Sequence, residues 1–336
     1  MTGRAGSVFL QRLRRVKSGC PGDRQGSGVS AYGAARVCGA VFRVVAPPFL
    51  LPALLLVLIC LAAAHAVELR LQEVAASAAP IAPAGKSDQL PHSRVARGDR
   101  DIAAAWLAGA TDRYGHGVLG DALEASRLVV ETRAGRRLQI ELPAHRVFED
   151  LEPRLADLDG DSRDEIIVVE SDINLGASLA VYSVDADRLV KRAATAFLGQ
   201  SNRWLNPLGV GDFDGDGRPD IALVATPHIG GILRLYRFDG AVLSPFAEAR
   251  GVSTHRLGST ELALGRVVPN RPRDWILLPD QAQRALLLLE WSNEGWRELA
   301  RVQLPARLDS ALLPLNQHRW RFRVEGGKSF MIKLTR

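Results

Sequence analysis

The stretch GDFDGDGRPDIALVAT, residues 211–226, crowds four aspartates together and then continues directly into an apolar, β-branched segment. The aspartates fall at positions 1, 3, 5 and 9 of a loop: Asp212, Asp214, Asp216 and Asp220. Gly217 stands at position 6, where a sharp turn needs a positive φ. This is the spacing of the oxygen ligands in a calcium loop, with the backbone carbonyl of Arg218 at position 7 as a further ligand. Without a cation, converging carboxylates would repel one another.

Two other interpretations compete with calcium binding. A solvated Asp/Gly turn without metal is one, because both residues favour turns for local reasons. An EF-hand is the other, but its loop needs a bidentate glutamate at position 12 and an exiting helix. This sequence has Leu223 at that position, within a segment typical of a buried strand. The loop is therefore predicted to connect two strands.

The same loop occurs earlier in the chain, in ADLDGDSRDEIIVVE at 156–170. Its acidic residues at positions 1, 3, 5 and 9 are Asp157, Asp159, Asp161 and Glu165, and Arg163 stands at position 7. Ser162 replaces the glycine at position 6, which predicts a slightly strained turn. The sequence thus predicts two calcium sites.

A third copy, LGRVVPNRPRDWILLPD, stands at 264–280 and aligns with the Asp212 loop without a gap. Arg266 takes the place of Asp212, and only Asn270 and Asp274 remain as oxygen-bearing side chains of the loop. We expect this third loop to keep the scaffold and to bind no metal.

Each repeat contains four short apolar segments separated by turn signals, and the nearly constant spacing of the three copies is typical of β-propeller blades. The sequence therefore predicts an all-β protein, a β-propeller of about five four-stranded blades. The predicted blades are 102–142, 154–198, 208–250, 261–304 and 310–336. The first of them includes a glycine-broken strand at 114–120, and the last lacks a fourth strand. We expect 68–74 to supply that strand, because a propeller seals its sheet edges.

Both acidic loops, each followed by an apolar strand, resemble the FG-GAP or VCBS repeats of bacterial exported proteins and of integrin α-chain propellers. The resemblance implies that each loop joins the first two strands of a blade and holds calcium at the rim. This chain has fewer blades than the integrin pattern, and its third loop is degenerate.

The segment 1–66 has the layout of a secretory leader. An uncharged apolar run, 44–64, follows a basic segment and ends at Ala64-His65-Ala66, so cleavage would make Val67 the first mature residue. A retained membrane anchor is the alternative, because an apolar run of this length can span a bilayer. The basic segment is unusually long, which an incorrectly assigned start would explain. Residues 74–93, rich in Ala, Pro and Ser, are predicted to belong to a linker, 67–100.

The charge and cysteine distributions restrict the partners. Eight of the 43 basic residues but one of the 37 acidic residues lie in 1–66, so the rest of the chain is nearly neutral and a nucleic-acid partner has little electrostatic support. All three cysteines, Cys20, Cys38 and Cys60, lie in the leader, so the mature chain uses no disulfides. A monomer is expected, with an unidentified protein or carbohydrate ligand.

No catalytic motif is present. The seven histidines show no zinc-binding spacing, and lone surface histidines are the expected interpretation. The segments Tyr114-Gly115-His116-Gly117 and 227–231 (PHIGG) are interpreted as a broken strand and a tight hairpin. We therefore expect an exported, calcium-binding, non-enzymatic binding or structural module. The alternative is a hydrolase of the cell envelope that acts on carbohydrate or phosphoester from the same propeller platform, for which acids or histidines would have to converge at the axial mouth.

Overall fold

The computed structural model describes residues 67–76 and 85–336, which belong to one unit of the chain, 63–336. The expected leader, with its apolar run 44–64, lies outside the described residues. Within the described part, no helix is long and apolar enough to cross a membrane. Every regular element is a strand, so the all-β prediction is confirmed.

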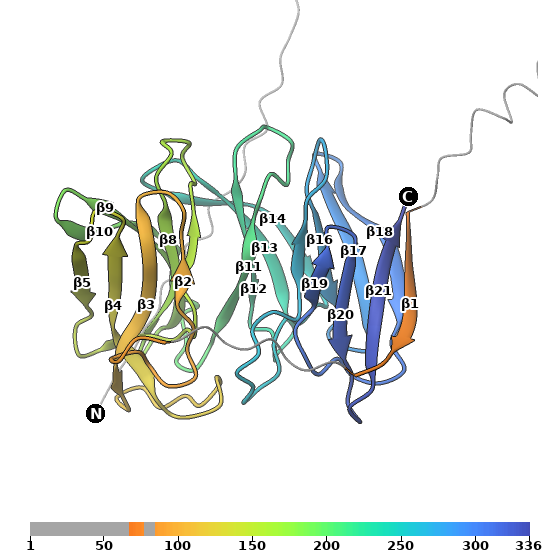
Figure 1. The fold of residues 1–336 in the computed structure, drawn as a ribbon, viewed down its shortest axis with the longest axis horizontal. Coiled ribbons are helices and arrows are strands. Elements are labelled where there is room, and N and C mark those ends of the chain that lie inside the picture. Colours follow the sequence, from red (N-terminus) through yellow and green to blue (C-terminus); the bar gives the residue numbers. More distant parts are fainter. Residues whose placement is uncertain (1–66, 77–84) are drawn as a thin grey trace, which may run out of the picture. The chain divides into compact units, whose positions relative to one another are not determined.

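Counted along the chain, the third and fourth sheets are regular four-stranded antiparallel blades (Figure 1). The third contains β11 (Leu205–Gly211), β12 (Asp220–Ala225), β13 (Ile232–Phe238) and β14 (Leu243–Arg250). The fourth contains β15 (Arg266–Val268), β16 (Trp275–Pro279), β17 (Ala285–Ser292) and β18 (Gly295–Gln303). In both sheets the strands pair in sequence order, and β11 contacts β15. This is the architecture of β-propeller blades.

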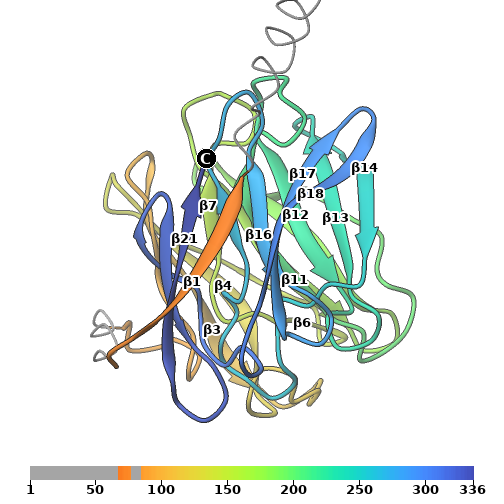
Figure 2. The ribbon, with the colours of Figure 1, turned by 90° about the vertical axis from the view of Figure 1, so that its right-hand side faces the viewer.

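The fifth sheet combines the two ends of the described chain. It contains β19 (Leu313–Asn316), β20 (Arg319–Arg323) and β21 (Ser329–Thr335), with β1 (Glu68–Val74) as its fourth strand. β1 pairs antiparallel with β21 from Glu68↔Thr335 to Val74↔Ser329, and Figure 2 shows the two strands side by side. β1 also contacts β18 of the fourth sheet. The segment expected to complete the last blade therefore occupies that position.

The first two sheets are joined through one short strand. The first contains β2 (Ala96–Arg97), β3 (Ile102–Thr111), β4 (Glu124–Thr132) and β5 (Arg137–Glu141). The second contains β7 (Arg154–Ala156), β8 (Glu165–Asp172), β9 (Gly176–Asp185) and β10 (Arg188–Ala194). Between them, β6 (Arg146–Phe148) pairs with both β4 and β8.

The strand predicted at 114–120 is wrong. These residues belong to an irregular loop, 112–123, between β3 and β4, and the first sheet takes β2 as its innermost strand instead. Gly115, Gly117 and Gly120 have φ angles of 60°, 65° and 107°, which an extended strand does not allow. Within the expected linker 67–100, β1 is the strand expected at 68–74, and β2 is a further short strand.

The continuous apolar run after the acidic loop is explained by burial on both faces of the sheet. Along β12, Ile221 and Leu223 pack into a core shared with the second sheet, whereas Ala222 and Val224 pack into a core shared with the fourth. All six β12 residues are buried. A middle strand of a blade has neighbours on both sides, so alternation of polar and apolar residues is lost.

Successive loops of a blade lie at opposite ends of its strands. The acidic loops join the first strand to the second, and Figure 1 shows them at the top of the view. The loop 112–123 and the turn 226–231 join the second strand to the third, at the other end. The propeller thus presents two chemically distinct ends.

Candidate functional site

The first acidic loop joins β7 to β8 and wraps around the carboxylate of its first aspartate. Asp157 accepts the N–H of Gly160 on Oδ1 at 2.7 Å and the N–H of Ser162 on Oδ2 at 3.0 Å. Asp159 Oδ1 accepts the N–H of Asp161 at 3.2 Å. The backbone donors of the loop are therefore satisfied by its own carboxylates, as in Asx turns.

The second acidic loop, between β11 and β12, repeats these hydrogen bonds. Asp212 accepts the N–H of Gly215 at 2.7 Å and the N–H of Gly217 at 3.0 Å. Asp214 Oδ1 accepts the N–H of Asp216 at 3.0 Å. The two loops therefore have the same local conformation, although they lie in different sheets.

The last acid of each loop stands at the start of the second strand and points back at the loop. Glu165 Oε2 accepts the N–H of Leu158 at 2.8 Å, and Asp220 Oδ2 accepts the N–H of Phe213 at 3.3 Å. As a result, three acids of each loop place one carboxylate oxygen each within 4.8 Å of the others: Asp157, Asp159 and Glu165, and Asp212, Asp214 and Asp220.

The aspartates at position 5 do not belong to these groups of three carboxylates. Asp161 is exposed and accepts the N–H of Arg163 at 2.8 Å. Asp216 accepts the N–H of Arg218 at 2.8 Å and also pairs with the Arg218 guanidinium at 3.0 Å. At position 5, therefore, the carboxylate caps the end of the loop, and the acidic groups contain positions 1, 3 and 9.

The acidic groups are electrostatically costly in the absence of a cation. Burial, followed by the charges of neighbouring aspartates, raises the pKa of Glu165 to about 7. Burial, followed by the charge of Asp214, raises the pKa of Asp220 to about 7. Both shifts have the cause expected for carboxylates that share a partly buried site. A cation bound in either loop would remove that repulsion.

The two acidic loops differ in the nearest protein cation. Arg237 on β13 pairs with Asp214, with Nε 3.0 Å from Oδ2, and the Asp214 side chain is only 5% exposed. Strand pairing aligns the two blades, because Tyr182 pairs with Ile166 just as Tyr236 pairs with Ile221. The residue after Tyr236 is Arg237, and the residue after Tyr182 is Ser183. The first loop therefore has a serine where the second has an arginine. The second loop is therefore partly neutralised by its own sheet.

In the first loop, the nearby arginine faces another partner. Arg163 Nε lies 3.3 Å from Asp101 Oδ2, in the turn between β2 and β3. The same aspartate accepts the N–H of Asp164 at 2.8 Å. These contacts attach the outer side of the first loop to the first sheet and leave its three carboxylates without a paired arginine in the described residues.

The third loop supports the second. Asp274 Oδ2 accepts the N–H of Asp212 at 3.0 Å, and its Oδ1 accepts the N–H of Asn270 at 2.8 Å. Arg273 Nε donates to the carbonyl of Asp214 at 3.1 Å. Arg266 donates to the carbonyl of Leu312 at 2.8 Å. The one remaining acid of this loop thus holds the backbone of its neighbour.

The donor sets of the first two loops suit a hard divalent cation. Each set consists of carboxylate oxygens alone, without sulfur or imidazole nitrogen, and such sets are typical of Ca²⁺ or Mg²⁺ sites. Calcium takes about six to eight oxygens, so backbone carbonyls and water would have to complete the shell around three carboxylates. These acidic clusters can hold a metal ion.

A second polar cluster at the opposite end was missed by the sequence analysis. His116 Nδ1 lies 2.5 Å from Glu149 Oε1, and the buried Ser171 hydroxyl donates to Glu149 Oε2. Glu124 accepts the N–H groups of Gly115 and His116, both at 3.1 Å. Burial raises the pKa of Glu124 to about 7. Acids and a histidine therefore converge here.

Two further histidines lie in this region, so the expectation of lone surface histidines is wrong. His228 Nε2 is 2.8 Å from His255 Nδ1, and His255 Nε2 is 2.8 Å from the carbonyl of Ser259. A carbonyl only accepts, so His255 carries its proton on Nε2 and accepts from His228 at Nδ1. Both rings pack on Trp204. No sequence spacing could show these contacts, which join separate connections between strands.

Comparison with known families identifies one part of the chain. A family described as FG-GAP-like repeat matches residues 157–223, from the first acid of the first loop into β12. This segment of the chain is an FG-GAP-like repeat. The VCBS-specific and integrin-specific parts of the resemblance stay a prediction. No curated protein matches the chain.

Proposed function

We propose that this protein is an exported, non-enzymatic binding or structural module whose two acidic loops hold calcium. The observation that carries the proposal is the convergence of three carboxylates at equivalent positions of two neighbouring blades. The FG-GAP-like match over 157–223 supports it, because that segment contains both loops. Calcium would order the loops and thereby shape the rim of the propeller, where a protein or carbohydrate ligand would bind.

The energetic contribution of calcium is modest in this proposal. Extracellular calcium modules have dissociation constants of about 10⁻⁴ to 10⁻³ M, so millimolar calcium would stabilise the fold by about 1 kcal/mol per site. Each loop places one side chain in the apolar cores, Leu158 or Phe213, and the strands supply most of the rest. Calcium would therefore order the rim, and the apolar cores would supply most of the folding free energy.

Isothermal titration calorimetry of the calcium-free protein tests the proposal. We expect two calcium ions per chain in the wild type and one in Asp157→Ala or Asp212→Ala. Asp187→Ala is the matched control, because Asp187 is an exposed acid in the turn between β9 and β10, outside both loops. A stoichiometry unaffected by the two loop substitutions would refute the assignment of calcium to these carboxylates.

Export is part of the same proposal and has its own test. The basic segment, the apolar run 44–64 and the Ala64-His65-Ala66 sequence support cleavage before Val67. N-terminal sequencing of the mature protein should therefore begin at Val67. An intact leader would support the membrane-anchored alternative.

The enzymatic alternative, a hydrolase of carbohydrate or phosphoester, is favoured by one observation. His116, Glu124 and Glu149 converge at the end opposite the acidic loops, and buried carboxyl groups with raised pKa values are candidates for general acid–base catalysis. Assays with chromogenic glycosides and phosphoesters distinguish the two functions. Turnover that is lost in Glu124→Gln would establish the enzyme and contradict the non-enzymatic proposal.

A further inference from the structure

A cavity of about 490 Å³ lies between the second and third sheets, close to the first acidic loop. Its walls come from the innermost strands β7 and β11 and from their neighbours β8 and β12, with Arg100 from the turn between β2 and β3 and Asp157 from the first acidic loop. Its volume falls within the range of about 300–1,000 Å³ that is typical of small-molecule sites. The cavity is therefore large enough for a small organic ligand.

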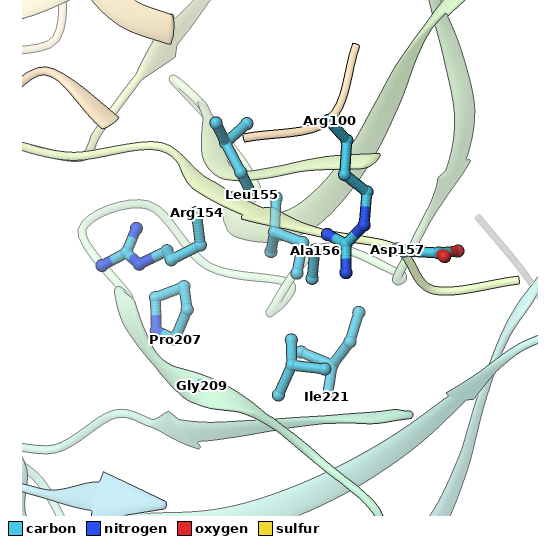
Figure 3. A pocket seen from close by; sticks show the side chains of 10 residues that line it. Arg100, Arg154, Leu155, Ala156, Asp157, Pro207, Gly209 and Ile221 are labelled. Carbon is cyan, nitrogen blue, oxygen red and sulfur yellow. The ribbon is translucent and has the colours of Figure 1, made fainter. Parts of the chain in front are cut away.

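The cavity wall has an apolar part and a cationic part. The side chains of Ile167 and Ile221 form a buried apolar surface, extended by Leu155, Pro207 and Val210. The charged lining residues are Arg100, Arg154 and Asp157, so the lining carries two cations and one anion. Figure 3 shows the guanidinium of Arg100 pointing into the cavity above Ile221, and Arg154 beside Pro207. Such walls suit a molecule with an apolar body and an acidic group.

Arg154 is held in place by a buried carboxylate and a backbone carbonyl. Its Nη1 donates to the carboxylate of Asp150, which is fully buried, and to the carbonyl of Glu152 at 2.6 Å. Asp150 is fixed in turn, because its oxygens also accept the N–H groups of Leu151 at 2.9 Å and Val169 at 3.2 Å. The arginine is thus positioned before any ligand arrives, which reduces the conformational entropy lost on binding.

Arg100 is held in a similar way. Its Nη1 donates to Oδ1 of Asp164 at 2.7 Å, and Asp164 is 2% exposed. A guanidinium has five N–H donors. In the described part of the chain, Nε and Nη2 of both Arg100 and Arg154 make no hydrogen bond. Oriented donors thus remain for an anionic group, which guanidinium binds in bidentate geometry.

We propose that this cavity binds a small organic anion, a carboxylate or a phosphate monoester with an apolar body. Arg100, whose guanidinium points into the cavity, binds the acidic group, and Ile167, Ile221 and their neighbours contact the body. The site lies apart from the second acidic loop and from the histidine cluster, and it requires neither of them to be occupied.

The cavity also shares one residue with the first loop, so the two sites are expected to be coupled. Asp157 lines the cavity and belongs to the first acidic group. Its charge opposes an anion in the cavity, and a cation in the loop would offset that charge. This coupling, which rests on the proposed calcium function, predicts that calcium tightens anion binding and that the anion tightens calcium binding by the same factor.

Calorimetric titration with benzoate, phenyl phosphate and the neutral benzyl alcohol tests the site on the full-length protein, with and without calcium. We expect saturable binding of at least one of the two anions and none of benzyl alcohol. Preference for benzoate or for phenyl phosphate identifies the acidic group. The proposal would be overturned if neither anion bound saturably, with or without calcium. It would also be overturned if benzyl alcohol bound with the same affinity as the anions.

Two variants and a control assign the binding to the cavity. Arg100→Gln should weaken anion affinity about tenfold, because it removes a charge-assisted contact. Val210→Phe should abolish binding, because the larger side chain fills the cavity while both arginines remain. This variant tests the location of the site even if Arg100→Gln does not fold. Arg97→Gln, on the exposed side of β2, should leave affinity unchanged. Wild-type affinity in Val210→Phe, or equal effects of Arg97→Gln and Arg100→Gln, would contradict the assignment.

The calcium arm separates this proposal from the function proposed above. Anion binding that is independent of calcium, in a protein that binds two calcium ions, would refute the coupling and keep the cavity site. Anion binding in a protein that binds no calcium would refute the calcium function alone. Calcium binding without anion binding would refute the cavity site alone.

Discussion

The two acidic loops have the same fold and the same three converging acids, but they are neutralised differently. In the second loop, Arg237 reaches across from β13 to Asp214, whereas the first loop has Ser183 at the equivalent place. In the second loop, position 6 is glycine with φ 84°, and in the first it is Ser162 with φ 69°. One loop therefore has an internal cation and a relaxed turn, and the other has neither.

Two loops with the same ligand spacing can therefore differ in their affinity for calcium. The charge that an ion would meet in each loop is set by residues outside the motif, on a neighbouring strand. The first loop should bind calcium more tightly, because in the described residues no arginine forms an ion pair with its three carboxylates. The second should be better ordered without calcium, because Arg237 already offsets part of its charge.

The largest expected effect comes from the third loop, which supports the second. Asp274→Ala leaves the N–H groups of Asp212 and Asn270 without their acceptor and should destabilise the fold by about 2 kcal/mol. Chemical denaturation measures this loss. Asp239→Ala is the matched control, since Asp239 also accepts two backbone N–H groups but in a fully exposed turn. An equal loss in both variants would contradict a supporting role for Asp274.

A pH effect separates the loops from the opposite end of the propeller. Burial lowers the pKa of His228 to about 4 and that of His255 to about 3. Below the ordinary pKa of about 6.5, the unfolded chain takes up protons that the folded chain does not, so stability falls as pH decreases toward 4. Relative to His228→Phe, the wild type should lose on the order of 1 kcal/mol between pH 6.5 and 5, after allowance for solvent screening.

Denaturation at several pH values, with and without calcium, checks this expectation. The difference between wild type and His228→Phe should be the same in both conditions, because the histidines lie at the other end of the strands. A calcium-dependent difference would mean that the two ends are coupled.

The arginine beside the second loop can be removed, and an arginine can be introduced at the equivalent place beside the first. Arg237→Ser should tighten calcium binding at the second loop about fivefold, since it removes a competing charge worth about 1 kcal/mol at a partly exposed site. Ser183→Arg should weaken the first loop by a similar factor. Calorimetry of both variants measures the change, with Arg234→Ser as the control on the same strand, because Arg234 pairs with Glu248. Unchanged affinities in both exchanges would remove the basis of the comparison.

The smallest effect concerns the turn. Ser162→Gly should stabilise the calcium-free protein by about 0.5 kcal/mol, because a serine at φ 69° is strained and a glycine is not, although glycine costs more entropy. Gly217→Ser should have the opposite effect in the second loop. Thermal denaturation of the pair measures both changes. A stabilising Gly217→Ser would contradict the strain assigned to position 6.

The sequence predicted those parts of the structure that are encoded locally. The loop spacing, the buried strands that follow, and the segment 68–74 as the fourth strand of the last sheet can all be recognised from short patterns. The structure groups positions 1, 3 and 9 of each loop, whereas Asp161 and Asp216 at position 5 accept backbone N–H groups two residues on, so their role as calcium ligands stays a prediction. Spacing alone does not distinguish a ligand from a cap.

Contacts between blades could not be predicted in the same way. His116 reaches Glu149 because loop 112–123 folds back over the second sheet. The cavity depends on three sheets meeting beside Arg100 and Arg154. These features follow from the register of strands that are distant in the sequence, and no single repeat contains the information.

The most direct test of the calcium assignment is a crystal structure grown in millimolar calcium, with anomalous scattering to locate the ions. The account predicts one calcium among Asp157, Asp159 and Glu165, a second among Asp212, Asp214 and Asp220, and none at Asp274. Well-ordered carboxylates in both loops with only water between them would contradict it.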